Sequence, residues 1–241
     1  MKGLSLVFYL FSILFLAAGL YVKGIENKEG VETITIGSRT ESNQIVYNLP
    51  LENGTLLIRI TLPDNFQSSG HFPVLLAPGL DGGNLETGCR YFGKDPEQHG
   101  WILVESLVHL KGVRAMNRLL DYLDGQYKVE GFHLLGFSAN SVPQFKMARQ
   151  LSKRISSVTG MPGHPEFKNT AALNELEDFK VLMVVGEKDY WWKNSATKAR
   201  QKMQEYGLPV NLLVVADGGH ILDEFAGKPL FKELEKLRTT Q

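Results

Sequence analysis

The stretch that decides the fold is FHLLGFSAN, residues 132–140. Its first four residues form a mostly apolar run typical of a buried strand, and a glycine then introduces Ser138. Apolar residues recur at helical spacing directly afterwards, at Val142, Phe145 and Ala148. The serine is therefore expected on a tight turn between a strand and a helix, where its hydroxyl would stand above the end of a sheet as a nucleophile. An ordinary turn serine is the alternative interpretation of the same residues.

Strands and helices alternate on both sides of this turn. Apolar runs predict strands at residues 72–77, 101–105, 132–135, 155–159, 181–185 and 210–215. Helix-spaced apolar residues separate them, and the helix that follows Val113 is expected to stop at Gly125. This alternation predicts an α/β protein with a mainly parallel, doubly wound sheet and helices on both faces.

The segment before residue 72 has a different pattern. Strands are expected at 31–37, 44–49 and 55–62, and Asn53-Gly54 between the last two is a strong hairpin signal. These strands would form antiparallel edges of the same sheet. No repeat or second folded domain is visible, so residues 26–241 are interpreted as one domain.

Two further loops follow predicted strands and carry groups that could assist a nucleophile. Asp189 lies in Gly186-Glu187-Lys188-Asp189, where an acid could orient a histidine, and Glu187 is the rival candidate. His220 ends Asp217-Gly218-Gly219-His220 and could act as a general base. Ligands and catalytic groups gather beyond the carboxyl ends of parallel strands, so these side chains are expected near Ser138.

A nucleophile that attacks an ester also needs donors for the oxyanion that forms. The glycine-rich loop Pro78-Gly79-Leu80-Asp81-Gly82-Gly83 follows the strand at 72–77 and could aim the backbone N–H of Leu80 at that charge. The second donor would be the N–H of Ala139. A simple strand-to-helix turn would also favour these glycines.

From Phe72 onward the chain resembles the α/β-hydrolase superfamily, and within it small capless esterases of the dienelactone-hydrolase and carboxylesterase kinds. The residues that carry the resemblance are Pro78–Gly82, Gly136–Asn140, Gly186–Asp189 and Gly218–His220. The resemblance implies an α/β-hydrolase fold with Ser138 as nucleophile, His220 as base and Asp189 as acid, in the chain order of that family. Two positions depart from it: Asn140 stands where glycine is usual, and Pro78 where many members have histidine.

The remaining histidines and the charge balance argue against metal catalysis and nucleic-acid binding. His71 and His99 precede strands, His133 lies within one, and His109 and His164 follow strands and could line the site. No metal site is expected, because the chain lacks a His-Glu-x-x-His motif and has a single cysteine. Lys and Arg number 26, as do Asp and Glu, so no basic field favours nucleic acid.

The combined interpretation is a serine hydrolase that cleaves carboxylic esters through an acyl-enzyme, without a cofactor. No large cap is expected, because only residues 160–180 separate two predicted strands, so a small-molecule ester with a short or accessible acyl group would reach an open site. Trp191 and Trp192, with Tyr190, would wall that site, or would pack as ordinary surface residues. A thioesterase or peptidase with the same triad, and a non-enzymatic membrane-anchored binding protein, are the alternatives.

The N-terminal segment is interpreted separately. Residues 4–22 are uncharged and long enough to cross a bilayer as a helix. Residues 1–25 are therefore expected to be a signal anchor that tethers the protein to a membrane, or a signal peptide cleaved near Ala17-Ala18-Gly19. A cleaved leader would make the protein periplasmic or extracellular.

We expect deletion of residues 1–28 to give a soluble, active protein, while the full chain fractionates with membranes, because residues 4–22 supply the apolar surface that partitions into lipid. Cell fractionation with an N-terminal tag measures both possibilities. A tag retained on the mature protein favours an anchor, and its loss favours cleavage. A full-length chain that stays entirely in the soluble fraction with its tag intact would contradict both.

Overall fold

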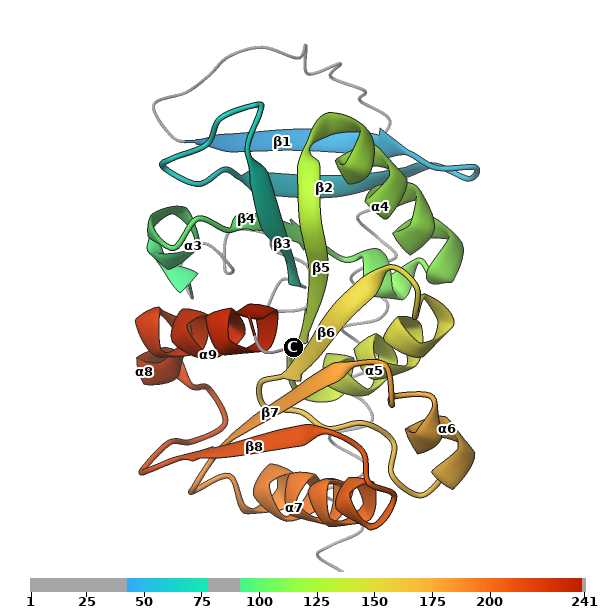
Figure 1. The fold of residues 1–241 in the computed structure, drawn as a ribbon, viewed down its shortest axis with the longest axis vertical. Coiled ribbons are helices and arrows are strands. Elements are labelled where there is room, and N and C mark those ends of the chain that lie inside the picture. The colour runs from blue at the N-terminus through green and yellow to red at the C-terminus, as the bar shows by residue number, and fades with distance from the viewer. Residues whose placement is uncertain (1–42, 78–91, 240–241) are drawn as a thin grey trace, which may run out of the picture. The chain divides into compact units, whose positions relative to one another are not determined.

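The computed structural model describes residues 43–77 and 92–239, and its centre is an eight-stranded sheet (Figure 1). The strands are β1 (Gln44–Pro50), β2 (Thr55–Thr61), β3 (His71–Ala77), β4 (Ile102–Ser106), β5 (Lys128–Gly136), β6 (Ile155–Gly160), β7 (Lys180–Gly186) and β8 (Val210–Val215). Their order is β1-β2-β4-β3-β5-β6-β7-β8. Pairing is antiparallel for β1–β2 and β2–β4 and parallel from β4 to β8, which confirms the expected sheet. The strand expected at 31–37 lies outside the described residues.

Helices cover both faces of the sheet. They are α3 (Asp95–Gln98), η1 (Val108–Leu110), α4 (Val113–Gln126), η2 (Ser138–Asn140), α5 (Ser141–Gln150), α6 (Thr170–Asn174), α7 (Tyr190–Glu205), α8 (Asp223–Ala226) and α9 (Lys228–Thr239). Figure 1 shows α9 on the opposite side of β5 and β6 from α4 and α5. Alternation along the strands explains this layering, since successive side chains point to opposite faces. In β3, for example, Val74 packs in the core of α4, α5 and α7, and Leu75 packs in the core of α8 and α9.

The prediction that the helix stops at Gly125 is wrong, because the helix ends slightly later. Helix α4 continues through Gly125 to Gln126, because a glycine in a helix is tolerated and does not by itself end it. The chain leaves the helix at Tyr127, whose extended backbone leads into β5 and whose ring packs edge-on against Phe66. The hairpin expected at Asn53-Gly54 is present, with Gly54 at a φ of +85°.

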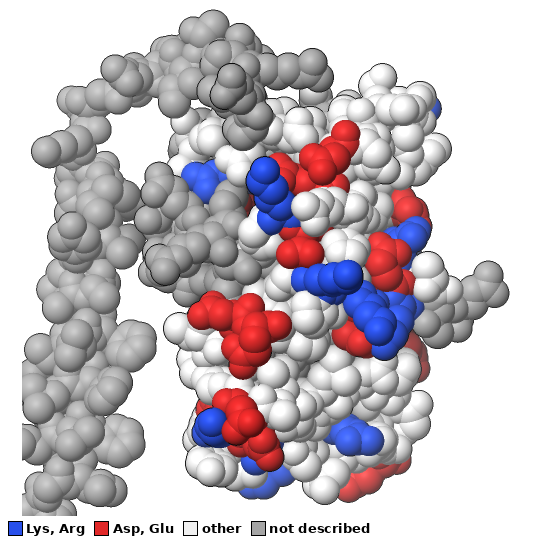
Figure 2. Space-filling view, turned by 90° about the vertical axis from the view of Figure 1, so that its left-hand side faces the viewer, with Lys and Arg blue, Asp and Glu red and all other residues white. Residues whose placement is uncertain are grey.

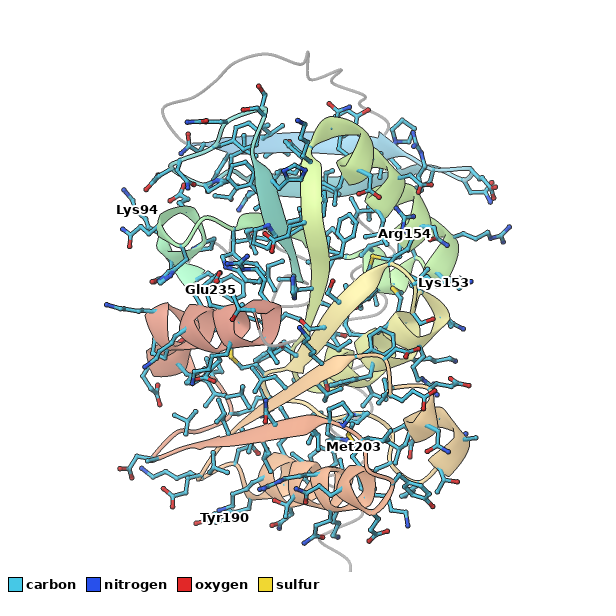
Figure 3. All side chains as sticks on the ribbon, viewed as in Figure 1. Lys94, Lys153, Arg154, Tyr190, Met203 and Glu235 are labelled. Carbon is cyan, nitrogen blue, oxygen red and sulfur yellow. The ribbon has the colours of Figure 1, made fainter. Side chains whose placement is uncertain are left out.

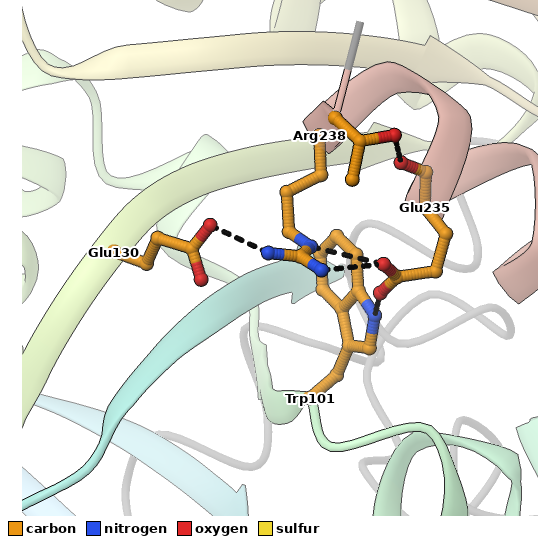
Figure 4. Close-up of polar contacts among 5 residues, drawn as sticks. Trp101, Glu130, Glu235 and Arg238 are labelled. Carbon is orange, nitrogen blue, oxygen red and sulfur yellow. Dashed lines mark hydrogen bonds and ion pairs between the residues drawn. The ribbon is translucent and has the colours of Figure 1, made fainter.

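Charged side chains fasten two helices to the sheet. The Arg154 guanidinium, just before β6, donates to Asp121 at 2.6 Å and to Asp124 at 2.7 Å, both on α4 (Figure 3). On the other face Glu235 of α9 accepts from the Trp101 indole at 2.6 Å and from Arg238 (Figure 4).

Lys and Arg side chains are interspersed with Asp and Glu on the face that Figure 2 displays. Within residues 43–77 and 92–239, no helix combines the length and the apolar character that a membrane crossing requires. The expected leader at 1–25 lies outside the described residues.

His133 is a core residue, as its position within a strand predicts. It is 2% exposed, its Nδ1 lies 2.7 Å from the Ser157 hydroxyl, and its ring packs against Trp101. Burial, with Lys180 and Arg238 nearby, lowers the pKa of His133 to about 4. Between pH 6.5 and about 4, the folded protein therefore keeps this ring neutral, whereas an unfolded chain would protonate it.

We expect the free energy of unfolding to fall as the pH drops from 6.5 toward 4, because only the unfolded chain takes up a proton on His133 in that window. The contribution of this one group is on the order of 3 kcal/mol, because the shift is roughly two to three pKa units. Urea denaturation between pH 4 and 7 measures it against His133→Gln, which keeps a hydrogen-bonding group beside Ser157 but does not titrate. Equal pH slopes for the two proteins would contradict the assignment.

Candidate active site

Ser138 occupies the turn at the carboxyl end of β5. Its φ is +52°, in the left-handed region that a residue other than glycine rarely adopts. The Ser138 N–H donates to the Pro162 carbonyl at 2.8 Å, so the segment after β6 supports the turn. A strained serine turn of this kind, between strand and helix, exposes the hydroxyl at the end of the sheet.

Close backbone packing holds the turn in place. A Cβ on Gly136 would lie 2.5 Å from the Cα of Ser141, and one on Gly163 would collide with the Ser141 side chain. The Ser141 hydroxyl in turn donates to the Ser138 carbonyl at 2.7 Å. Any side chain at either glycine would therefore push α5 away and move Ser138 with it.

His220 connects Ser138 to Asp189. Its Nε2 lies 2.9 Å from the Ser138 hydroxyl oxygen, and its Nδ1 lies 2.6 Å from Oδ2 of Asp189. A carboxylate can only accept, so Nδ1 carries the proton and Nε2 is left to accept from the serine. The three side chains predicted from separate loops thus form one continuous hydrogen-bonded chain that can move a proton off Ser138.

The rival acid, Glu187, has a different contact. Its carboxylate accepts from the backbone N–H of Asp217 at 3.0 Å. The Asp189 side chain is 11% exposed and faces the histidine, whose own side chain is 43% exposed. The structure therefore brings Asp189, and not Glu187, into contact with His220.

Backbone hydrogen bonds join the loop after β7 to the loop after β8. The Glu187 N–H donates to Val215 at 2.9 Å, and the Lys188 N–H donates to Gly218 at 2.8 Å. A Cβ on Gly186 would collide with the Gly219 carbonyl, so the two loops touch along their backbones. This contact fixes Asp189 and His220 relative to each other.

Two aromatic rings lie beside the His220 ring. Phe137 lies edge-on to the His220 ring at 5.6 Å between centroids, and the Trp192 ring is tilted against it at 6.2 Å. Trp192 is only 8% exposed and backs the site, whereas Trp191 is 65% exposed and Tyr190 is 69% exposed at the start of α7 (Figure 3). The two tryptophans predicted as substrate walls are therefore in different environments, and their binding role stays a prediction.

One of the two predicted oxyanion donors lies within the described residues. Ala139 follows Ser138 in η2 and is exposed, and its role as an oxyanion donor stays a prediction. Leu80 lies outside the described residues.

The other histidines fall into two groups, one far from Ser138 and one near it, as their sequence positions predict. His71 begins β3, and His99 precedes β4 and stacks on Phe231 of α9, so both lie at the opposite end of the strands from Ser138. His109 and His164 lie near the site and are each 8% exposed, and burial lowers the pKa of both. No group of three potential metal ligands occurs among residues 43–77 and 92–239.

Some contacts near Ser138 had no clear sequence signal. The Pro162 carbonyl accepts the Ser138 N–H, and Gly163 packs against the Ser141 side chain, although no sequence motif relates residues 162–163 to the serine turn. The contact of Phe137 with His220 does have a sequence signal, because Phe137 stands between Gly136 and Ser138 in the motif.

Comparison with models of protein families finds no match, and no curated protein sequence matches. Among solved structures, a ferulic acid esterase is similar over 81% of this chain and 96% of its own, with 18% identity and a TM-score of 0.63. A dienelactone hydrolase from Anabaena variabilis is similar over 82% and 97%, with 13% identity and a TM-score of 0.60. The feruloyl esterase module from Clostridium thermocellum is similar over 76% and 85%, with 11% identity and a TM-score of 0.62. At these identities the likeness establishes the fold, and the chain has the α/β-hydrolase fold.

We expect Asp189→Asn to lower kcat by about 10⁴, the order of loss when a triad acid no longer holds the histidine tautomer. Glu187→Gln is the matched control, because it is a neighbouring acid whose carboxylate bonds to the Asp217 N–H and not to His220. Steady-state kinetics on an activated ester would measure both. A large loss in Glu187→Gln with little change in Asp189→Asn would reverse the assignment of the acid.

Proposed function

We propose that this chain is a serine hydrolase that cleaves carboxylic esters through an acyl-enzyme on Ser138. The observation that carries the proposal is the continuous chain of short hydrogen bonds from the Ser138 hydroxyl through His220 to Asp189. A neutral histidine that accepts from a serine, and is oriented by a carboxylate, is the arrangement that makes serine nucleophilic.

Each proton has a defined route in the proposed reaction. The Ser138 oxygen attacks the ester carbonyl carbon while its proton passes to Nε2 of His220, and the carbonyl oxygen becomes an oxyanion. The bond to the alcohol then breaks, and the proton on Nε2 goes to the departing oxygen. Water attacks the acyl group by the same route in reverse, so that the acid leaves and Ser138 regains its proton. Asp189 stabilises the charged imidazolium in both halves.

The oxyanion would be stabilised by backbone N–H groups. Ala139 is proposed as one donor because it directly follows Ser138 at the start of a helix, where N–H groups are unpaired and the helix dipole favours negative charge. The N–H of Leu80 is proposed as the second donor, from its place after β3.

An accessible ester is the proposed substrate. Between β6 and β7 the chain holds one helix, α6, of five residues, so no large cap covers the serine from that segment. The solved structures with this fold include proteins named as esterases of ferulic acid and as dienelactone hydrolases, which supports ester cleavage in general.

We expect Ser138→Ala to abolish both ester hydrolysis and covalent labelling by a fluorophosphonate probe, because the probe reacts with an activated serine oxygen. Ser156→Ala is the matched control, since Ser156 is exposed on β6 and takes no part in the hydrogen-bonded chain. Gel-based labelling and a panel of p-nitrophenyl esters, thioesters and peptide anilides would measure the result. Labelling that persists in Ser138→Ala would refute the proposal, and a thioester or anilide preference would redirect it.

A further inference from the structure

A row of aromatic rings leads from His220 to the surface of the protein. The Trp192 ring is tilted against the His220 ring at 6.2 Å between centroids, and the Trp191 ring meets Trp192 edge-on at 4.8 Å. Trp192 is 8% exposed, whereas Trp191 is 65% exposed. The outer ring therefore offers exposed apolar surface only two ring contacts away from the proposed general base.

Packing behind these rings holds them in place. The buried His164 ring lies 5.2 Å from the Trp192 ring and 6.3 Å from the Trp191 ring. Trp192 also belongs to the apolar core that α4, α5 and α7 form with the sheet. Because Trp191 leans on rings that are themselves held in the core, a ligand that contacts it meets a surface that is already in place.

The chemistry of the proposed reaction decides which half of an ester lies near these rings. In the tetrahedral intermediate, the former carbonyl carbon carries the Ser138 oxygen, the oxyanion, the acyl substituent and the alcohol oxygen. The alcohol oxygen receives the proton from Nε2 of His220, so it must come within about 2.6–3.2 Å of that nitrogen. The oxyanion is directed to the proposed Ala139 donor, and the acyl substituent takes the remaining direction. The alcohol half is thus the part of the substrate that is tied to His220 and its flanking rings.

The charged groups next to the two tryptophans in the sequence favour a neutral alcohol. The Lys188 ammonium pairs with Asp217 at 3.0 Å, and the Lys193 ammonium donates to the Glu187 carbonyl at 2.8 Å. Lys193 also lies over the exposed Tyr190 ring, 5.1 Å from its centroid, so a cation already occupies one face of that ring. A cationic alcohol would be repelled there, and an anionic one would compete with the partners that these ammonium groups already have.

We propose that Trp191 and Trp192 form the subsite for the alcohol half of the ester, and that the preferred substrates are esters of neutral alcohols that carry an aromatic ring. The inference rests on the proposed function, because only a reaction through Ser138 and His220 fixes which half of the ester lies beside these rings. An aromatic group gains both apolar burial and a favourable edge-on or offset contact with tryptophan. Selection at these rings acts before the alcohol leaves, so it appears in kcat/KM.

Two isomeric esters test the inference in the full-length protein. Benzyl acetate carries its ring on the alcohol, and methyl phenylacetate carries the same ring on the acid, so the two compounds have one composition. After division by their rates of hydrolysis in alkali, kcat/KM of the wild-type protein is expected to be on the order of tenfold higher for benzyl acetate, as one aromatic contact with its burial provides.

Three variants assign that preference to the exposed tryptophan. Trp191→Ala is expected to remove most of the preference by lowering kcat/KM for benzyl acetate alone. Trp191→Phe keeps a ring and is expected to retain most of it. Tyr206→Ala is the matched control, since Tyr206 is an exposed aromatic residue at the far end of α7, and its ratio is expected to equal that of the wild type.

A wild-type preference for methyl phenylacetate would overturn the inference, and this result requires no variant to fold. An isomer ratio in Trp191→Ala that equals the wild-type ratio would overturn it as well, whether both rates fall together or neither changes. Ser138→Ala is run in parallel on both esters. Activity equal to the wild type in Ser138→Ala would refute the proposed function itself, which is a different result from an unchanged isomer ratio in an enzyme that depends on Ser138.

Discussion

The left-handed turn at Ser138 is the constraint on which the rest of the site depends. A serine at a φ of +52° is not stable by itself, so its neighbours must hold it there. The Pro162 carbonyl accepts its N–H, and Ser141 packs between Gly136 and Gly163 so closely that no Cβ fits at either glycine. The strain therefore persists because β5, α5 and the segment after β6 are packed as one unit, and the result is a hydroxyl that projects from the sheet.

The sheet explains why residues far apart in the sequence meet at that hydroxyl. Strands β5, β7 and β8 run parallel, so their carboxyl ends lie at one edge, and Ser138, Asp189 and His220 each follow one of these ends. The apolar cores on both faces hold the strands in register, and the loops after β7 and β8 are joined by backbone hydrogen bonds. Fold stability and site geometry thus depend on the same contacts.

Periodicity and the placement of loops were enough to predict the parallel sheet, its antiparallel edge and the proximity of Ser138, Asp189 and His220. What could not be predicted depends on side-chain direction and on contacts distant in sequence. Glu187 and Asp189 both follow β7, and they differ in their contacts: Asp189 lies against His220, whereas Glu187 accepts from the Asp217 N–H. Trp191 and Trp192 are adjacent, yet a helix turns successive residues by about 100°, so one faces water and the other the core.

His220, the proposed general base, follows β8, one of the two edge strands of the described sheet. Strand β8 has one neighbour, β7, and several of its side chains remain partly exposed, so it has fewer contacts than the central strands. Edges and termini open locally with less free energy than the core. Detachment of β8 would withdraw His220 while β3, β5 and their helices stay folded. The proposed activity would then be lost through local unfolding at one edge, at temperatures where most of the amide protons are still protected from exchange.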